Sequence, residues 1–229
     1  MLPIYCGYDP REAAVYHVFC QSVIENAKSP VCFIPLHQAH LNGFDGQQDG
    51  TNAFIFSRYL VPYLQGFEGA AIFVDGDMIV NADINELIDL FDPEYAVQVV
   101  KHDYQTRQPR KYIGTPLAND NKDYPRKNWS SFVLWNCGHS ETRNLSLRMV
   151  NEQSGLYLHR FNFLSDEFVG ELPIKFNYLE GWYTKEDEPN PLGVHFTRGG
   201  PWFKDYVDVE YGDEWVEMYK NIYKEVSND

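Results

Sequence analysis

The sequence predicts one α/β domain built on a mostly parallel central sheet with helices on both faces. Apolar runs of strand length alternate with segments of helical periodicity, and these runs are continuously apolar, as in strands that are buried on both faces. The 229 residues are 44% apolar and 16% aromatic, which is enough for one sizeable core. Because no internal repeat or low-complexity linker interrupts the pattern, we expect a single domain over residues 1–229.

The chain is expected to open with a strand, a tight turn and a helix. Leu2 to Tyr8 is apolar and strand-like. The tetrapeptide at 9–12, Asp-Pro-Arg-Glu, then supplies a capping Asp, a Pro at the first helical position and a Glu at the third. Apolar residues recur with helical spacing from Ala14 to Val23, which predicts a first helix over this stretch.

The remaining elements follow in the order that an open α/β sheet requires. The sequence predicts strands at 31–36, 69–74, 95–100, 131–136, 174–178 and 194–196, and helices at 52–60, 83–91, 141–151 and 213–226. Residues 101–128 are polar and lack periodicity, so we expect a long loop there. Such loops in compact domains often form lids or binding elements.

Charge and composition exclude several classes of function. A formal net charge of −14 argues against a nucleic-acid partner, because binding the phosphate backbone requires a cationic face. No apolar run approaches the length of about 20 residues that spans a bilayer, and residues 213–229 contain more acidic than basic residues. The four cysteines have no CxxC spacing, which indicates reduced thiols. We therefore expect a soluble, cytoplasmic protein without stable membrane insertion.

The stretch with the most informative chemistry is Asp75-Gly76-Asp77, which directly follows the apolar run at 69–74. Ligand sites in open α/β sheets gather at the carboxyl ends of strands. Two carboxylates beside a short turn suit Mg²⁺ or Mn²⁺, which could bind a nucleoside diphosphate and stabilise it as a leaving group. A turn shaped around Gly76 explains the same pattern equally well. A calcium loop does not, because Ile79 and Val80 occupy the fifth and sixth positions of its frame.

Two motifs in this order resemble glycosyltransferase family 8, the GT-A group that includes glycogenin, galactinol synthase and lipooligosaccharide galactosyltransferases. The first motif is the acidic pair, and the second is Gly-Val-His-Phe-Thr-Arg-Gly-Gly-Pro-Trp at 193–202. The segments at 57–59 and 128–136 also stand in the family's order, so the resemblance spans nearly the whole chain. It implies a Rossmann-like GT-A fold and the transfer of a hexosyl group from a nucleotide-sugar, such as a UDP-sugar, with retention of anomeric configuration. The acceptor would be a saccharide or another small molecule.

The resemblance also implies roles for individual residues. Asp75, Asp77 and His195 would hold Mn²⁺ (or Mg²⁺), and the imidazole nitrogen favours Mn²⁺. Arg58 would contact the diphosphate, because a guanidinium fork matches phosphate oxygens. Asp166 would be the catalytic carboxylate beside the anomeric centre. Without the resemblance, Arg58 is interpreted as a surface arginine, His195 as a structural histidine and Asp166 as a helix cap.

Further donor contacts are expected from Tyr8, Asp9, Gly76, Arg198 and Gly199. Asp9 would act both as a helix cap and as a contact to the base or ribose. Tyr8 would stack on the base, and an ordinary strand-end aromatic is an equally good interpretation.

Aromatic residues near the second motif have a further expected role. Trp182, Tyr183 and Trp202 offer flat surfaces for sugar rings, although most aromatic residues of the chain should lie in the core.

Two positions depart from the family pattern. Gly200 stands where the family has a Lys before Pro-Trp, which leaves Arg198 or Lys204 to neutralise the diphosphate. Glu167 follows Asp166 where a Gln is common, so the donor sugar is not defined by the resemblance. These departures keep open a non-enzymatic nucleotide-sugar or carbohydrate binding protein of the same fold. A sugar nucleotidyltransferase is disfavoured, because no Gly-rich phosphate loop follows the first strand.

Overall fold

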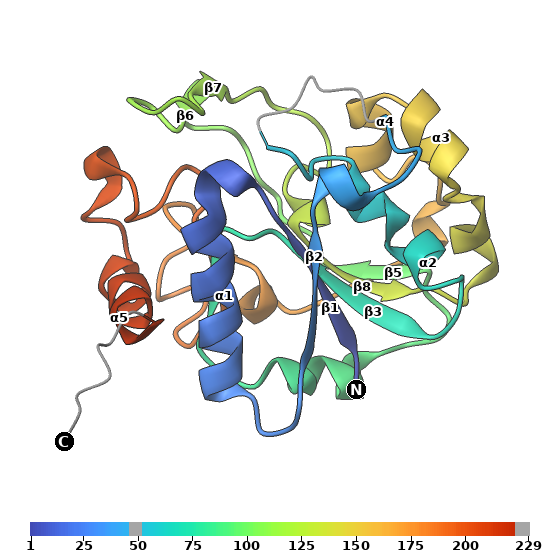
Figure 1. The fold of residues 1–229 in the computed structure, drawn as a ribbon, viewed down its shortest axis with the longest axis horizontal. Coiled ribbons are helices and arrows are strands. Elements are labelled where there is room, and N and C mark those ends of the chain that lie inside the picture. The colour runs from blue at the N-terminus through green and yellow to red at the C-terminus, as the bar shows by residue number, and fades with distance from the viewer. Residues whose placement is uncertain (46–51, 223–229) are drawn as a thin grey trace.

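A computed structural model describes residues 1–45 and 52–222 and shows an α/β fold around a six-stranded sheet (Figure 1). The strand order is β2-β1-β3-β8-β5-β9. These strands are β1 (Pro3–Gly7), β2 (Cys32–Leu36), β3 (Ala70–Val74), β5 (Val97–Val99), β8 (Phe132–Asn136) and β9 (Val169–Glu171). Only β8 runs antiparallel to its neighbours, β3 and β5, while the other pairs are parallel. The prediction of a mostly parallel α/β sheet is therefore confirmed.

Two smaller sheets complete the strands. One has the order β10-β11-β4 and contains β4 (Met78–Val80), β10 (Tyr178–Leu179) and β11 (Gly193–His195). The other is a ribbon of β6 (Arg110–Lys111) and β7 (Asn119–Asp120) inside the expected long loop. Strands this short give no periodic signal, which explains why β4, β6, β7 and β9 were not predicted. The strand expected at 174–178 is a 3-10 turn (Ile174–Phe176) followed by β10.

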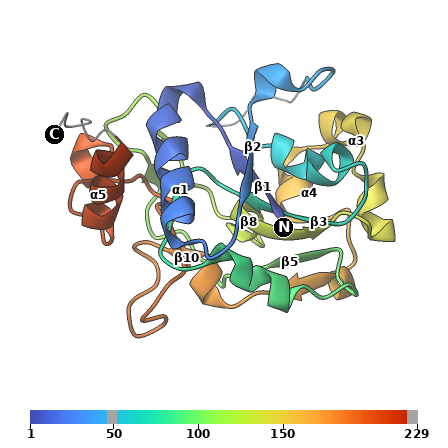
Figure 2. The same ribbon diagram turned by 60° about the horizontal axis from the view of Figure 1, so that its bottom comes forward.

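Helices cover both faces of the central sheet, as predicted (Figures 1 and 2). The α-helices are α1 (Ala13–Asn26), α2 (Val61–Leu64), α3 (Leu147–Glu152), α4 (Gly155–His159) and α5 (Gly212–Ile222). Adjacent residues of β3 point to opposite faces: Ile72 packs in the cluster with Phe19 of α1, and Phe73 packs in the cluster with Leu158 of α4. No helix within the described ranges is long and apolar enough to cross a membrane.

Several expected helices are shorter or tighter than predicted. The helix expected at 52–60 is a 3-10 turn (Ser57–Leu60) that continues into α2, and Pro62 lies in the first turn of α2, where it loses no hydrogen bond. The helix expected at 141–151 is split into a 3-10 turn (Ser140–Asn144) and α3. The side chain of Ser146 accepts a hydrogen bond from the backbone N–H of Met149 and so caps the start of α3.

Two other helix predictions agree more closely with the structure. The segment at 83–91 forms a 3-10 helix (Ile84–Leu90) that Asp83 caps as expected. The predicted closing helix at 213–226 corresponds to α5, and residues 223–226 lie outside the described residues. The remaining 3-10 turns are Pro10–Glu12, Gln38–His40, Trp129–Ser131, Asp166–Phe168 and Lys204–Tyr206.

The four cysteines are free thiols, in agreement with the sequence-based expectation. Cys6 and Cys137 are buried, Cys20 is half-buried, and Cys32 is exposed because it opens the edge strand β2.

Candidate functional site

The acidic pair lies in the turn between β3 and β4. This turn requires Gly76, because a Cβ atom at that position would come within 2.7 Å of the carbonyl oxygen of Gly7 at the end of β1. The backbone N–H of Asp75 donates to the carbonyl oxygen of Ser131 at 2.8 Å, just before β8 begins. Three strands of the central sheet thus fix the position of this turn.

His195 reaches the acidic pair through the second sheet. In the antiparallel pairing of β4 with β11, His195 lies opposite Met78, the residue that follows Asp77. The backbone N–H of Phe196 also donates to the carbonyl oxygen of Asp77 at 3.0 Å. Strand register therefore brings together two motifs that are far apart in the sequence.

Asp75, Asp77 and His195 form a cluster in which one potential ligand atom from each lies within 4.8 Å of the others. Nε2 of His195 lies 3.2 Å from Oδ1 of Asp77 and 4.0 Å from Oδ2 of Asp75. Oδ1 of Asp77 is buried and accepts no hydrogen bond from any residue in 1–45 or 52–222. Two carboxylates and one imidazole, with one carboxylate oxygen buried and without a donor, fit a divalent cation. The structure thus brings together the three residues predicted as metal ligands.

Asn177 orients the imidazole of His195. Nδ1 of His195 lies 3.1 Å from Oδ1 of Asn177, so Nδ1–H donates to the amide oxygen and Nε2 faces the carboxylates. Asn177 in turn donates to Oγ of Ser131 at 2.8 Å and to Nε2 of His102 at 3.0 Å. Burial, with a smaller contribution from His195, lowers the pKa of His102 to about 3 and keeps it a neutral acceptor.

Arg58 is buried beside the acidic pair and is not a surface arginine. Its Nη1 lies 2.9 Å from Oδ1 of Asp75 and donates to the carbonyl oxygen of Ser130 at 2.8 Å. Burial raises the pKa of Asp75 above its usual value, although Arg58 opposes this effect. Burial also acts on Asp77, but attraction by His195 outweighs it and lowers the pKa of Asp77. The cluster therefore retains negative charge at neutral pH.

A cleft lies over this cluster, and Arg58 lines it together with the three cluster residues. Segment 101–128 forms much of the wall and lies over the end of the sheet at which β1 ends (Figure 1). Its lining residues are Lys111, Tyr112, Asn121, Tyr124, Lys127 and Asn128. The expected loop is thus part of the cleft.

Lys127 connects different parts of segment 101–128 through hydrogen bonds. Its Nζ donates to Oγ1 of Thr106 at 2.9 Å, to Oδ1 of Asn121 at 2.5 Å and to the carbonyl oxygen of Lys122 at 2.7 Å. An ammonium group has three N–H donors, so Lys127 uses all of them within the segment. This residue therefore stabilises the cleft wall.

A smaller hollow beside the end of β1 shares part of its wall with the cleft and contains Asp9. Asp9 caps the turn that precedes α1: it accepts from the backbone and guanidinium of Arg11, and its Oδ2 accepts from Ala53 N at 3.0 Å. The predicted capping role is confirmed, whereas the contact to a base or ribose stays a prediction. Tyr8 stacks on His37 with ring centroids 5.2 Å apart, and its stacking on a base also stays a prediction.

Trp202, at the end of the second motif, packs against the start of the chain. Its Nε1 donates to Oε1 of Glu12 at 3.0 Å, and its ring centroid lies 5.3 Å from that of Trp215. Burial, with a contribution from nearby Asp77, raises the pKa of Glu12 to about 7. Trp202 thus belongs with the aromatic residues that support packing.

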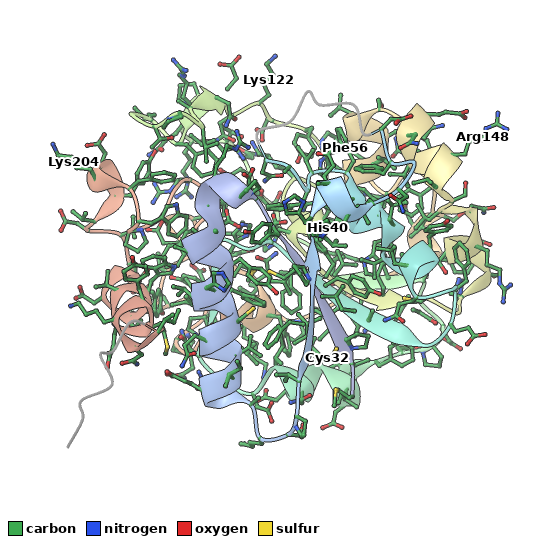
Figure 3. The ribbon with its side chains drawn as sticks, viewed as in Figure 1. Cys32, His40, Phe56, Lys122, Arg148 and Lys204 are labelled. Carbon is green, nitrogen blue, oxygen red and sulfur yellow. The ribbon has the colours of Figure 1, made fainter. Side chains whose placement is uncertain are left out.

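After β11, Thr197 lines the main cleft, whereas the side chain of Arg198 lies outside it. Nη2 of Arg198 donates to both carboxylate oxygens of Glu180, at 3.1 and 2.9 Å, and the side chain lines a separate hollow with Trp182. Gly199 has a φ of 130°, a left-handed value that favours glycine. Lys204 is exposed at the edge of the molecule (Figure 3). The structure therefore places neither predicted substitute cation, Arg198 or Lys204, in the wall of the main cleft.

Asp166 lies apart from the cluster. It begins the 3-10 turn Asp166–Phe168, its side chain is 87% exposed, and one oxygen lies 2.5 Å from Nη2 of Arg126. The residues that line the main cleft do not include Asp166. Its role beside the anomeric centre stays a prediction that the structure does not support with a contact.

No sequence pattern indicated four residues of the site: Lys111, Tyr112, Lys127 and Asn177. Lys111 and Tyr112 lie in a segment without periodicity, so no local pattern indicates that they reach the cleft. Asn177 fell within a predicted strand, and its polarity in an otherwise mixed stretch was the only available signal.

Comparison with known sequences identifies a relative over nearly the whole chain. The chain is 42% identical over 231 residues to Protein CDI of Arabidopsis thaliana, and the match covers 97% of this chain and 87% of that protein. No model of a known protein family matches the sequence.

Solved glycosyltransferase structures share the fold. The apo structure of the bifunctional glycosyltransferase WbbM has a TM-score of 0.70 at 15% identity, covering 96% of this chain and 50% of WbbM. GlyE of Streptococcus pneumoniae TIGR4 has a TM-score of 0.63 at 14% identity, covering 96% and 61%. The galactosyltransferase LgtC, in complex with donor and acceptor sugar analogues, has a TM-score of 0.59 at 14% identity, covering 99% and 98%.

The chain thus spans about half the length of WbbM and less than two thirds of GlyE, but nearly all of LgtC. Its central sheet and its resemblance to glycosyltransferase family 8 agree with these neighbours. The chain belongs to the family of Protein CDI and has the GT-A glycosyltransferase fold.

Proposed function

We propose that this protein is a metal-dependent glycosyltransferase that transfers a hexosyl group from a nucleotide-sugar to a saccharide or another small acceptor. The cluster of Asp75, Asp77 and His195 at the base of the cleft carries this proposal. The donor is proposed to be a UDP-sugar, the ion Mn²⁺, and the reaction one that retains the anomeric configuration.

The residues of the cluster would act by holding the ion and the donor. Asp75, Asp77 and His195 supply the ligands, and Asn177 fixes the imidazole in the tautomer that leaves Nε2 available. A bound divalent ion would neutralise the diphosphate and stabilise it as a leaving group. Arg58 adds a buried positive charge next to Asp75.

Transfer requires that one bond break and another form. The bond between the anomeric carbon and the terminal phosphate oxygen breaks, and its electron pair stays on the diphosphate. The hydroxyl oxygen of the acceptor bonds to the anomeric carbon, and its proton passes to the departing diphosphate. In this arrangement, the nucleoside would lie toward the hollow that contains Asp9, whose lining residue Tyr16 packs against Tyr8.

Donor hydrolysis tests this proposal without knowledge of the acceptor. The protein is incubated with UDP-glucose, UDP-galactose, UDP-N-acetylglucosamine or GDP-mannose in the presence of Mn²⁺, and released nucleotide is quantified. We expect slow release from at least one donor, which a chelator or the double substitution Asp75→Asn/Asp77→Asn abolishes.

Binding without turnover would support a second function. The departures at Gly200 and Glu167 from the family pattern motivate this second function, a nucleotide-sugar binding protein without activity. It would be supported if the folded protein binds a donor with Mn²⁺ but releases no nucleotide, even when a panel of acceptors is added. The absence of Mn²⁺-dependent binding of any nucleotide would refute both functions.

A further inference from the structure

Of the three Lys and Arg side chains that line the cleft, one has no hydrogen-bond or ion-pair partner within residues 1–45 and 52–222. Arg58 is paired with a carboxylate and with backbone carbonyls, and Lys127 uses its three donors inside segment 101–128. Among the residues that the structure describes, Nζ of Lys111 forms neither a hydrogen bond nor an ion pair. Its Nζ also lies 5.1 Å from the ring centroid of Tyr112, in a cation–π contact. Lys111 therefore has N–H donors available to a ligand.

The backbone next to Lys111 is firmly placed against the site. Tyr112 has a φ of 53°, a left-handed conformation that is unfavourable for a bulky residue and persists where surrounding contacts fix it. Its backbone N–H donates to the carbonyl oxygen of Arg198 at 2.9 Å, and its hydroxyl donates to Oδ2 of Asp77 at 3.3 Å. These contacts connect the end of β6 to the acidic pair and keep Lys111 in the cleft wall.

The charges around Lys111 would be left unbalanced when a divalent ion binds. Burial lowers the pKa of Lys111, while attraction by Asp77 and Asp75 opposes this effect. An ion with two positive charges would neutralise these two carboxylates. The ammonium of Lys111 and the guanidinium of Arg58 would then require an anion in the same cleft, and a diphosphate provides one.

The position at which the family carries its lysine cannot supply this cation here. A Cβ atom at Gly200 would overlap the ring of Trp202. That ring is held by its hydrogen bond to Glu12 and by packing on Trp215, so a side chain at position 200 would require it to move. Position 200 is thus closed to a lysine, and segment 101–128 instead presents Lys111, whose ammonium has no hydrogen-bond or ion-pair partner among the described residues.

We propose that Lys111 binds the terminal phosphate of the donor's diphosphate and stabilises the negative charge that collects there as the glycosidic bond breaks. The proposal rests on the proposed function and makes segment 101–128 the source of a catalytic residue. Lys111 gains and loses no covalent bond in this step: its N–H groups donate to the phosphate oxygen that keeps the electron pair.

Calorimetric titration with UDP and with UMP, each in the presence of Mn²⁺, isolates the terminal phosphate. Lys111→Met should weaken UDP binding by about 10- to 100-fold, the usual effect of one charge-assisted contact. It should weaken UMP binding by less than about threefold, because UMP lacks the second phosphate. Lys111→Arg should keep most of the UDP affinity, and Lys204→Met, a substitution of an exposed lysine outside the cleft, should change neither.

The outcomes separate this inference from the function on which it rests. Equal weakening of UDP and UMP binding in a folded Lys111→Met variant would show a structural role for the lysine. Unchanged UDP affinity would place the terminal phosphate elsewhere. Either result, with a wild type that still binds UDP, overturns the inference. If UDP and GDP both fail to bind the wild type with Mn²⁺, the proposed function fails and the inference fails with it. Thermal unfolding of each variant verifies that the fold is intact.

Discussion

The two walls of the cleft are built in different ways. The acidic wall, formed by Asp75, Asp77 and His195, lies at the ends of β3, β4 and β11, whose positions are set by hydrogen-bonded strands and a buried core. The basic wall, formed by Lys111 and Lys127 of segment 101–128, contains only the two-residue strands β6 and β7. The position of the basic wall therefore depends on a few polar contacts, and a single substitution should displace it more easily.

This difference separates two tasks of the site. Metal affinity should depend on the acidic wall and tolerate changes in the basic wall. Affinity for the diphosphate should depend on both walls. Substitutions in one wall at a time test this division.

The largest effect is expected from Asp77→Asn. Removal of one of two carboxylate ligands should lower donor turnover by roughly a thousandfold or more, because the leaving diphosphate loses its ion. Mn²⁺ affinity and nucleotide release are measured side by side, with Asp89→Asn, an exposed carboxylate outside the cleft, as the matched control. Near-normal turnover in a folded Asp77→Asn protein would refute the metal site.

A smaller effect, on the free energy of unfolding, is expected from His102, which lies behind the acidic wall. The folded pKa of His102, about 3, lies below its unfolded value of about 6.5, so the unfolded state takes up a proton first as the pH falls. The stabilising contribution of neutral His102 should be complete above pH 6.5 and decline below it, by about 2 kcal/mol between pH 7 and pH 5.

Urea unfolding of His102→Gln at both pH values measures this contribution. The glutamine keeps an acceptor for Asn177 but binds no proton, so the variant should lose less free energy of unfolding than the wild type on acidification. His17→Gln, which removes an exposed histidine, is the control. Identical losses for wild type and His102→Gln would show that His102 is not held neutral by the fold.

Lys127→Met should disturb the basic wall alone. Loss of three hydrogen bonds within segment 101–128 should expose it to limited proteolysis and weaken UDP binding about tenfold. Mn²⁺ affinity without nucleotide should change less than about threefold, because the strands that carry the ligands are untouched. An equal loss of Mn²⁺ affinity would show that the two walls are not independent.

UDP with Mn²⁺ should protect the wild-type segment from cleavage if the segment closes on the donor.

The smallest effect is expected from Asp166→Asn. The side chain is exposed and paired with Arg126, and exposed ion pairs contribute about 0–1 kcal/mol. Donor turnover should therefore change by less than about threefold. A loss of a hundredfold or more, measured with the same donor, would instead support the catalytic role that the sequence alone suggests.

The same division explains what the sequence could and could not predict. The apolar run of β3, the acidic pair that follows it and the His of the second motif are local patterns, and the structure brings them together as expected. Lys111 has no such pattern, because its place depends on the path of a long segment that Lys127 and Tyr112 fix through distant contacts.

Arg198 shows the opposite error. It stands in the right motif, but a pair with Glu180 directs its guanidinium into a separate hollow. Motif spacing gives the position of a residue along the chain, whereas the direction of a long side chain depends on the partners that the fold supplies.

Anomalous scattering from crystals grown with Mn²⁺ and UDP locates the ion and the diphosphate in one experiment. We expect one Mn²⁺ peak in contact with carboxylate oxygens of Asp75 and Asp77, Nε2 of His195 and the diphosphate, with Nζ of Lys111 on the terminal phosphate. A Mn²⁺ peak elsewhere, or UDP bound away from the acidic wall, would contradict this expectation.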